Sequence, residues 1–216
     1  MDIELRLEKP SDYRTSENVM REAFWNVYSP GCSEHYLLHI MRRSPSYVKE
    51  LAYVAVLDGK IVGLVAFMKA YILTDGGCRL DVLSMGPIAV LPECQHTGVG
   101  RRLIQRAKEE ATRLGYRAIL LCGEPRYYSK VGFVAAERYG IRTAENKYSA
   151  ALHACPLYEG ALDSASGRYF EDEIYNVDET QVAAFDSLFP VKERIEGTPT
   201  QLRFAEVCAM QRDFIP

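Results

Sequence analysis

The 216-residue sequence predicts a mixed α/β domain, with an α+β mixed sheet covered by helices, and a C-terminal extension. Apolar runs typical of strands alternate with amphipathic helical patterns over 1–157. Asp58-Gly59, a preferred pair for a tight turn, separates two β-rich runs. Apolar and aromatic residues make up 48% of the chain, enough for a sizeable core. We expect the main domain over 1–157 and an extension over 158–216 packed on it, too short for a core of its own.

The first part of the chain predicts a strand, two helices and a hairpin. The alternating run at 3–9 predicts the first strand. Cap-type residues followed by an apolar face predict a helix within 9–28, and Ser33 is the expected cap of a second helix over 33–43. The two strands of the hairpin lie within 51–73.

A longer strand over 80–91 contains Gly86-Pro87. Proline cannot donate a ladder hydrogen bond and glycine weakens a strand, so we expect a bulge or a parting of strands there. From Val99 the apolar spacing becomes helical, and Gly115 is the expected end of that helix.

Shorter elements complete the expected fold: a buried strand over 116–122, a short helix turning into a strand within 124–133, and a strand over 151–158. The extension predicts a strand over 168–177 and a helix over 178–190, for which Asp178 and Thr180 are alternative caps. Residues 191–210 fit neither pattern clearly.

Net charge, the length of apolar runs and cysteine spacing argue against some classes of function. A net charge of −3 argues weakly against a nucleic-acid-binding face. The chain has no export signal and no apolar run of membrane-spanning length, so we expect a cytoplasmic protein without membrane contact. Its six cysteines form no CxxC pair and are expected to be reduced. His35 and His39 lie one helical turn apart but lack an evident third ligand, so no metal site is expected.

The stretch PECQHTGVGRRLI at 92–104 predicts a phosphate site. The helix starting near Gly98 has free backbone N–H groups and a positive dipole end, and glycines let a ligand approach closely. The two arginines after Gly100 add positive charge, but a Walker loop needs Lys-Ser/Thr there. A dinucleotide fingerprint needs a third glycine where Leu103 stands. From the loop alone, a glycine-rich helix start without a ligand is the alternative.

IAVLPECQHTGVGRRLI resembles the acetyl-CoA loop of the GNAT superfamily of N-acetyltransferases, whose Gln/Arg-x-x-Gly-x-Gly/Ala pattern is supplied by Gln95, Gly98 and Gly100. RYYSKVGF is similar to a second family element through Tyr127, Tyr128, Gly132 and Phe133. GPIAVLPE and CGEPRYYSKVGF resemble a bacterial subgroup of predicted acetyltransferases, although Leu121 stands where many members have a cofactor-binding Asn. The resemblance covers 3–157 and implies a GNAT-like acyl-CoA N-acyltransferase fold.

The resemblance also implies the chemistry: acetyl-CoA as co-substrate, no metal, and direct attack by a primary amine in a ternary complex. The expected cofactor-binding residues are Ile88, Ala89, Val90, Gln95, His96, Thr97, Gly98, Val99, Gly100, Arg101 and Arg102. An unpaired N–H near 88–90 would bond the acetyl carbonyl. Tyr128 is the expected general acid at the cofactor sulfur, because a phenol stays protonated at neutral pH. Simple packing of Tyr128 is the alternative, and Tyr127 is expected to pack rather than to react.

The general base and the acceptor site each have several candidate residues. The candidate general bases are Glu34, Asp81, Glu124 and His153. The acceptor, a small-molecule or peptide amine, is expected between residues 14–43 and the extension, with candidate wall residues Trp25, Tyr28, Tyr36 and Tyr71. The extension could cover the pocket or form a homodimer. A non-catalytic acyl-CoA binding or sensing module and a nucleotide-binding enzyme are the rival functions.

Overall fold

The structure is a computed structural model that describes residues 3–215, so residues 1, 2 and 216 at the ends of the predicted domain and extension lie outside it. Its strands are β1 (Glu4–Leu7), β2 (Tyr53–Leu57), β3 (Lys60–Thr74), β4 (Arg79–Val90), β5 (Ala118–Cys122), β6 (Val134–Ala135), β7 (Ile141–Arg142), β8 (Lys147–Ser149), β9 (Leu152–Pro156), β10 (Gly167–Phe170) and β11 (Gln211–Asp213). Its α-helices are α1 (Tyr13–Phe24), α2 (Glu34–Met41), α3 (Val99–Arg113), α4 (Pro125–Tyr128), α5 (Glu179–Asp186) and α6 (Pro199–Ala209).

One mainly antiparallel sheet organises the molecule and confirms the mixed α/β prediction. Its strand order is β1-β2-β3-β4-β5-β9-β6, in which β4 and β5 run parallel. The extension adds β10, which pairs with the last residues of β3 and with β7. The division at residue 157 stays a prediction.

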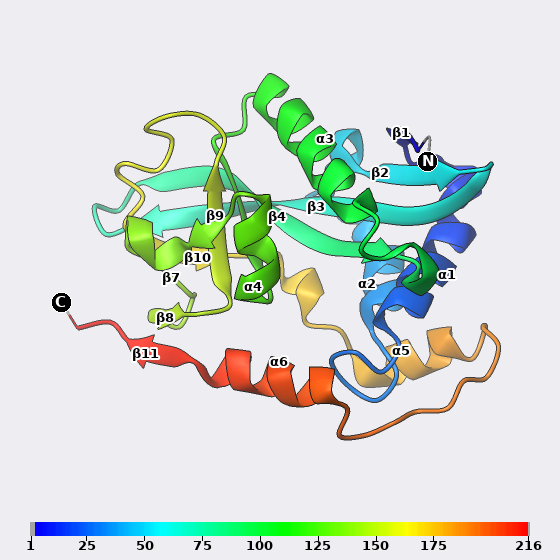
Figure 1. Ribbon diagram of the computed structural model, residues 1–216. Coiled ribbons are helices and arrows are strands. Elements are labelled where there is room, and N and C mark those ends of the chain that lie inside the picture. Colours follow the sequence, from blue (N-terminus) through cyan, green and yellow to red (C-terminus); the bar gives the residue numbers. More distant parts are fainter. Residues whose placement is uncertain (1–2, 216) are drawn as a thin grey trace.

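Helices cover both faces of the sheet (Figure 1). Successive residues of β3 point to opposite faces, so Val65 and Phe67 pack with the α3 residue Leu103. Leu64 and Ala66 join the core beneath α1 and α2. This two-sided burial explains why residues 61–68 of β3 contain no charged or polar side chain.

The predicted irregularity in β4 is confirmed. Its pairing with β3 shifts between two registers, leaving Gly86 and Pro87 together opposite Ala66. The pairing of β4 with β5 ends at Ser84, opposite Leu120. Beyond Ser84 the two strands part, and this fork positions the candidate site.

The local turn and cap signals were largely correct. The Asp58-Gly59 hairpin turn has two positive φ angles, +50° and +75°, as a type I′ turn requires. Gly115 follows α3 with φ +83°. Asp178 caps α5, accepting the backbone N–H groups of Thr180 and Gln181 at 2.7 and 3.1 Å. Sequence patterns overestimated two elements: the first helix is shorter than 9–28, and the strand expected over 168–177 ends at Phe170, followed by a 3₁₀ turn at Glu173–Tyr175.

The extension runs along the face opposite α3 (Figure 1). After β10 it places α5 against α2 and then α6 across the lower edge of the molecule. The ambiguous segment 191–210 therefore contains an irregular stretch and a helix, whose cap Thr198 accepts the N–H of Gln201 at 3.3 Å.

Candidate active site

A cavity of about 500 Å³ lies between the start of α3, the end of β4 and α4. This volume is within the range of small-molecule and cofactor sites, about 300–1,000 Å³. Of the residues predicted to bind the cofactor, it is lined by Ile88, Val90, Gln95, His96, Gly98, Val99, Gly100 and Arg101, and Tyr128 completes the wall. The structure therefore brings the glycine loop, the strand and the tyrosine around one space, which we call the cofactor cavity.

The start of α3 presents backbone donors to the cofactor cavity. Gly98 is the N-cap and has φ +92°, a conformation that L side chains rarely adopt. None of the backbone N–H groups from Gly98 to Arg101 donates a hydrogen bond within residues 3–215. Together with the positive end of the helix dipole, these donors suit a phosphate group.

Gly100 is buried in the first turn of α3. A Cβ there would lie 2.8 Å from the Tyr127 hydroxyl oxygen, so a larger residue would displace this phenol from its place over the helix start. Tyr127 therefore lines the cofactor cavity, although the sequence favoured a packing role for it.

The β4 edge that faces the cavity has free backbone donors. The Leu91 N–H donates to the Val62 carbonyl at 2.8 Å, on the β3 side. Because successive N–H groups of a strand alternate in direction, those of Ile88 and Val90 point to the other edge, where β5 has already parted. The Gln95 amide donates to the Val90 carbonyl at 3.1 Å and fixes the loop against this edge.

Three predicted cofactor residues do not line the cavity. The Ala89 side chain is 2% exposed and packs on the α1 and α2 side of the sheet. The Thr97 hydroxyl donates to the Cys94 carbonyl at 2.6 Å. The Arg102 guanidinium donates to the Ile3 carbonyl at 2.9 Å, tying α3 to the start of the chain.

Tyr128 is held in a fixed place by its neighbours. A Cβ at Gly123 would lie 2.2 Å from the Tyr128 ring, so glycine is required beside it. The ring also packs against Phe133 and His153, with centroids 5.8 and 6.0 Å away. Burial raises the pKa of the Tyr128 hydroxyl, which keeps it protonated at neutral pH.

A second cavity, of about 180 Å³, adjoins the first. The two share Phe24, Tyr28, Ile88 and Tyr128 as walls. The remaining lining residues of this second space, which we call the acceptor cavity, are Glu34, Leu37, Met85, Gly86, Pro87, Cys122, Glu171 and Tyr175. Tyr128 thus stands between a space suited to a cofactor and a space suited to a small second substrate.

The four candidate bases have different surroundings. Glu34 lines the acceptor cavity. Glu124 lines the cofactor cavity but pairs with Arg203 at 2.8 Å, which holds the pKa of its carboxyl below the usual range. Asp81 is exposed and pairs with Arg79 at 2.9 Å. The His153 ring is buried, which lowers its pKa, and Nε2 lies 3.3 Å from the Gly123 carbonyl oxygen.

Of the four aromatic residues predicted to line the acceptor site, Tyr28 is in place. It lines both cavities and stacks on Phe204 of α6, with centroids 4.5 Å apart. The Trp25 indole N–H donates to the Glu193 carbonyl at 2.8 Å, and Tyr36 hydrogen-bonds Gln181. Tyr71 stacks on Phe170 at 5.1 Å. These three side chains hold the extension instead.

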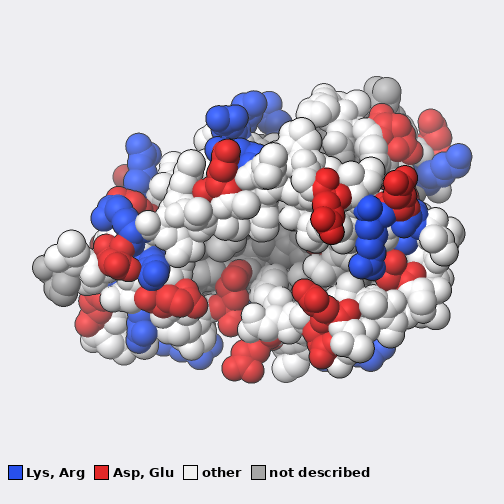
Figure 2. All heavy atoms as spheres, turned by 90° about the horizontal axis from the view of Figure 1, so that it is seen from below, with Lys and Arg blue, Asp and Glu red and all other residues white. Residues whose placement is uncertain are grey.

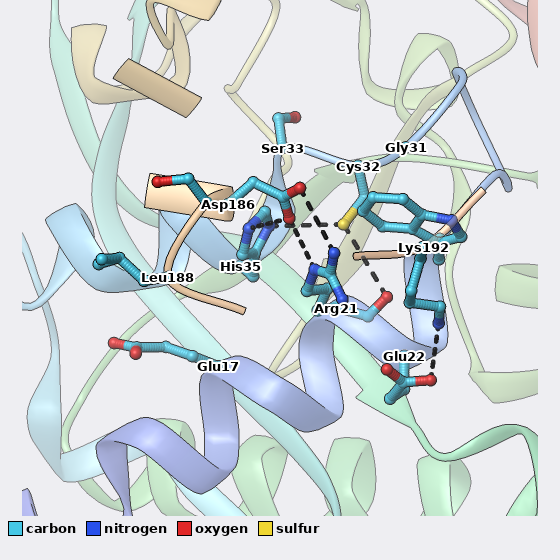
Figure 3. A network of polar contacts seen from close by, with 12 residues as sticks. Glu17, Arg21, Glu22, Gly31, Cys32, Ser33, His35, Asp186, Leu188 and Lys192 are labelled. Carbon is cyan, nitrogen blue, oxygen red and sulfur yellow. Dashed lines mark hydrogen bonds and ion pairs between the residues drawn. The ribbon is translucent and has the colours of Figure 1, made fainter. Parts of the chain in front are cut away.

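A buried polar cluster, which we call the clamp, joins α5 to α1 and α2 (Figure 3). The Arg21 guanidinium pairs with the Asp186 carboxylate at 2.6 Å. The His35 ring has Nε2 3.2 Å from Asp186 and Nδ1 3.4 Å from the Cys32 sulfur. Burial raises the pKa of the Cys32 thiol to about 12 and lowers that of His35 to about 4, so both are neutral near pH 7. The clamp therefore lacks a nucleophile.

Among residues 3–215, no group of three or more His, Cys, Asp or Glu side chains is placed to hold a metal ion. His39 instead contacts the Glu17 carboxylate at 2.9 Å. No helix in the same range is long and apolar enough to cross a membrane.

Sequence reasoning missed several residues of the acceptor cavity, among them Phe24, Cys122, Glu171 and Tyr175. Glu171 and Tyr175 were within a segment expected to be one strand. The break in its alternation after Phe170 is the signal that could have separated them.

Comparison with known proteins identifies the family. A model of the acetyltransferase (GNAT) family matches residues 18–133. The chain is 27% identical to the N-acetyltransferase YhbS of Escherichia coli (strain K12) over 173 residues, 80% of this chain and 98% of that protein. It is 34% identical to the N-acetyltransferase YjhQ of the same strain over 83 residues, 38% of this chain and 45% of that protein.

Solved structures agree with this assignment. The crystal structure of YhbS from Escherichia coli in complex with CoA matches with a TM-score of 0.72 and 26% identity, covering 81% of this chain and 92% of that one. A GNAT family acetyltransferase from Brucella melitensis in complex with acetyl-CoA has the same fold, with a TM-score of 0.64 and 24% identity, covering 81% of this chain and 98% of that one. The chain belongs to the GNAT family of acetyltransferases.

Proposed function

We propose that this N-acetyltransferase moves acetyl from acetyl-CoA to a primary amine by direct attack in a ternary complex. The observation that carries the proposal is the pair of cavities that adjoin at Tyr128. Direct transfer needs both substrates side by side, and these cavities supply adjacent spaces. The complexes of related structures with CoA and acetyl-CoA support the identity of the first substrate.

The residues of the cofactor cavity fit acetyl-CoA. The free N–H groups from Gly98 to Arg101 would hold the pyrophosphate, with Arg101 adding positive charge. Ile88 and Val90 would line the pantetheine arm, and their outward N–H groups would stabilise the thioester oxygen as negative charge develops on it. The bound thioester supplies an activated acetyl group and a thiolate leaving group.

Tyr128 would donate its hydroxyl proton to the departing sulfur. Its ring is fixed by Gly123, Phe133 and His153, so the donor is positioned before the substrates bind. The raised pKa keeps the hydroxyl protonated before the reaction begins.

Calorimetry with a matched pair of glycine variants tests the loop assignment. Gly98 and Gly115 flank α3, both have positive φ angles, and an added Cβ at either meets nothing within 4 Å. Gly98→Ala and Gly115→Ala should therefore strain the backbone similarly. We expect micromolar binding of acetyl-CoA and CoA, but not of ATP or NAD, to the unaltered protein.

Gly98→Ala should weaken acetyl-CoA binding about tenfold or more, since strain of about 1–3 kcal/mol would disturb the phosphate donors. Gly115→Ala should leave the affinity unchanged. Equal affinities of the two variants would refute the loop assignment. Absence of CoA binding to the unaltered protein would refute the proposed function, and binding without turnover of any amine would favour the sensing module.

A further inference from the structure

We propose that the acceptor cavity takes a small primary amine with a second positive charge, and that Glu171 accepts the proton this amine loses before attack. Glu34 would bind the second charge. This inference rests on the proposed function and names its acceptor class.

Glu171 lies where β4 and β5 part. Its Oε1 accepts hydrogen bonds from the Ser84 hydroxyl at 2.7 Å and the Tyr169 hydroxyl at 3.1 Å. Ser84 is the last β4 residue that pairs with β5. The Tyr175 hydroxyl lies 3.0 Å from the Ser84 oxygen and braces the same point. The carboxylate is therefore fixed at the fork, by residues of the sheet and of the extension.

Glu171 therefore lies near the place where we propose that the acetyl group is transferred. The acceptor cavity shares Ile88 and Tyr128 with the cofactor cavity, so an amine within it lies beside the proposed thioester site. At about 180 Å³ the cavity is below the range of about 300–1,000 Å³ typical of drug-sized ligands. It fits a small amine, or the amine-bearing end of a longer one.

The charges of the acceptor cavity indicate a cation. Glu34 and Glu171 are its ionisable carboxylates, and no Lys or Arg is among its lining residues. Neither carboxylate forms an ion pair with a described residue: Glu34 accepts the Ser33 N–H at 3.0 Å, and Glu171 accepts hydroxyls. Two carboxylates that line one small cavity without a cationic partner attract a cationic ligand, which would offset the repulsion between them.

The surroundings support the same ligand. Phe24 and Tyr28 are also in the wall, and aromatic rings attract cations. The face of the molecule opposite α3 is hollowed at its centre, with acidic side chains around the hollow (Figure 2). Two carboxylates in one small cavity suit a ligand with two ammonium groups.

Burial raises the pKa of both carboxyls, and the hydroxyls of Ser84 and Tyr169 only partly oppose this for Glu171. The other titratable groups near Glu171, Tyr175 and Cys122, also have raised pKa values and are neutral near pH 7. A carboxylate with a raised pKa is a better proton acceptor than one in water.

The substrate ammonium gives one proton to Glu171, which later releases it to solvent. The nitrogen lone pair then forms the N–C bond to the acetyl carbon, and the C–S bond breaks with its electrons passing to sulfur. The second proton that nitrogen loses restores Tyr128, which has given its own proton to sulfur. The products are the acetylated amine and CoA thiol.

Three amines with four carbons each test the charge preference of the full-length protein: putrescine, butylamine and γ-aminobutyrate. They differ at the far end, which carries an ammonium, a methyl or a carboxylate group. We expect kcat/KM to fall in that order, with putrescine at least about tenfold above butylamine, as one favourable charge contact predicts. Glu34→Gln should remove most of the preference for putrescine over butylamine.

Glu171→Gln should lower kcat by about 10²–10⁴ for every amine, the usual contribution of a positioned proton acceptor. Glu171→Asp should recover part of the rate. Acetyl-CoA affinity, measured by calorimetry, should stay within about twofold in each variant, which also shows that the variants fold.

Different outcomes would contradict the acceptor class, the role of Glu171 and the proposed function. If the protein binds acetyl-CoA but prefers butylamine or γ-aminobutyrate, or acetylates none of the three, the acceptor class is wrong. If Glu171→Gln binds acetyl-CoA and keeps kcat, the proton-acceptor role is wrong. Failure of the unaltered protein to bind acetyl-CoA would instead overturn the proposed function.

Discussion

The clamp and the acceptor cavity are both polar clusters between the main sheet and the extension, and they differ in how their charges are met. In the clamp, the Asp186 carboxylate is paired with Arg21 at 2.6 Å and packed against His35. In the acceptor cavity, Glu34 and Glu171 face a space and have no cationic partner among the described residues. The paired charges of the clamp join the extension to the main sheet, whereas the unpaired ones line the space that we propose for the acceptor.

The clamp also shows that residue types alone do not identify a catalytic site. Cys32, His35 and Asp186 are the residue types of a nucleophile with its base and orienting group. Yet Cys32 is only 7% exposed, and its raised pKa of about 12 leaves it a thiol. Access and protonation state, rather than residue identity, separate the clamp from a catalytic site.

Removing the charge of Asp186 should have the largest effect on stability. Asp186→Asn keeps the side-chain shape but leaves the Arg21 guanidinium, which is 1% exposed, without its counter-charge. We expect a loss of about 3–5 kcal/mol in the free energy of unfolding, measured by denaturant titration. Acetyl-CoA affinity should persist below the denaturation range. An unchanged unfolding midpoint would show that the clamp does not hold the extension.

Protonation of His35 should lower the free energy of unfolding by a smaller amount that depends on pH. Burial lowers its pKa from 6.5 to about 4. Between these values the unfolded chain binds a proton that the folded chain does not, so stability falls as pH is lowered through this window. The expected slope is up to about 1.4 kcal/mol per pH unit. His35→Gln, compared by denaturant titration at several pH values, should have a shallower slope; equal slopes would contradict a neutral buried His35.

Breaking the ion pair that joins α6 to the site should change stability and acetyl-CoA affinity the least. Arg203 pairs with Glu124, but both side chains are about a third exposed. Such pairs contribute little to stability. Arg203→Gln should leave the unfolding midpoint and the acetyl-CoA affinity unchanged, because the Phe204–Tyr28 stack remains. A large loss of affinity would mean that this ion pair, rather than aromatic packing, positions α6 at the site.

The features that sequence analysis predicted depend on short-range chemistry. The Asp58-Gly59 turn and the helix between Gly98 and Gly115 each follow from neighbouring residues. The bulge at Gly86-Pro87 does so as well. The loop positions that line the cofactor cavity came instead from the resemblance to the GNAT family.

The features that it missed depend on contacts between distant residues. Glu171 reaches Ser84 across 87 positions, and Asp186 reaches Arg21 across 165. Neither pairing leaves a local pattern, so the sequence could not tell that Glu171 faces a cavity or that α5 is clamped. The position of α6 could not be predicted from the sequence either, because it depends on the stacking of this helix on Tyr28.

The most direct test of the account is the rate of CoA thiol release by Tyr128→Phe with a saturating amine. Tyr128 separates the two cavities, and its proposed role as proton donor depends on the hydroxyl that phenylalanine lacks. The account predicts a kcat lower by about 10² or more, with acetyl-CoA affinity within about twofold of the unaltered protein. A kcat equal to that of the unaltered protein would contradict the assignment of the reaction to the junction of the two cavities.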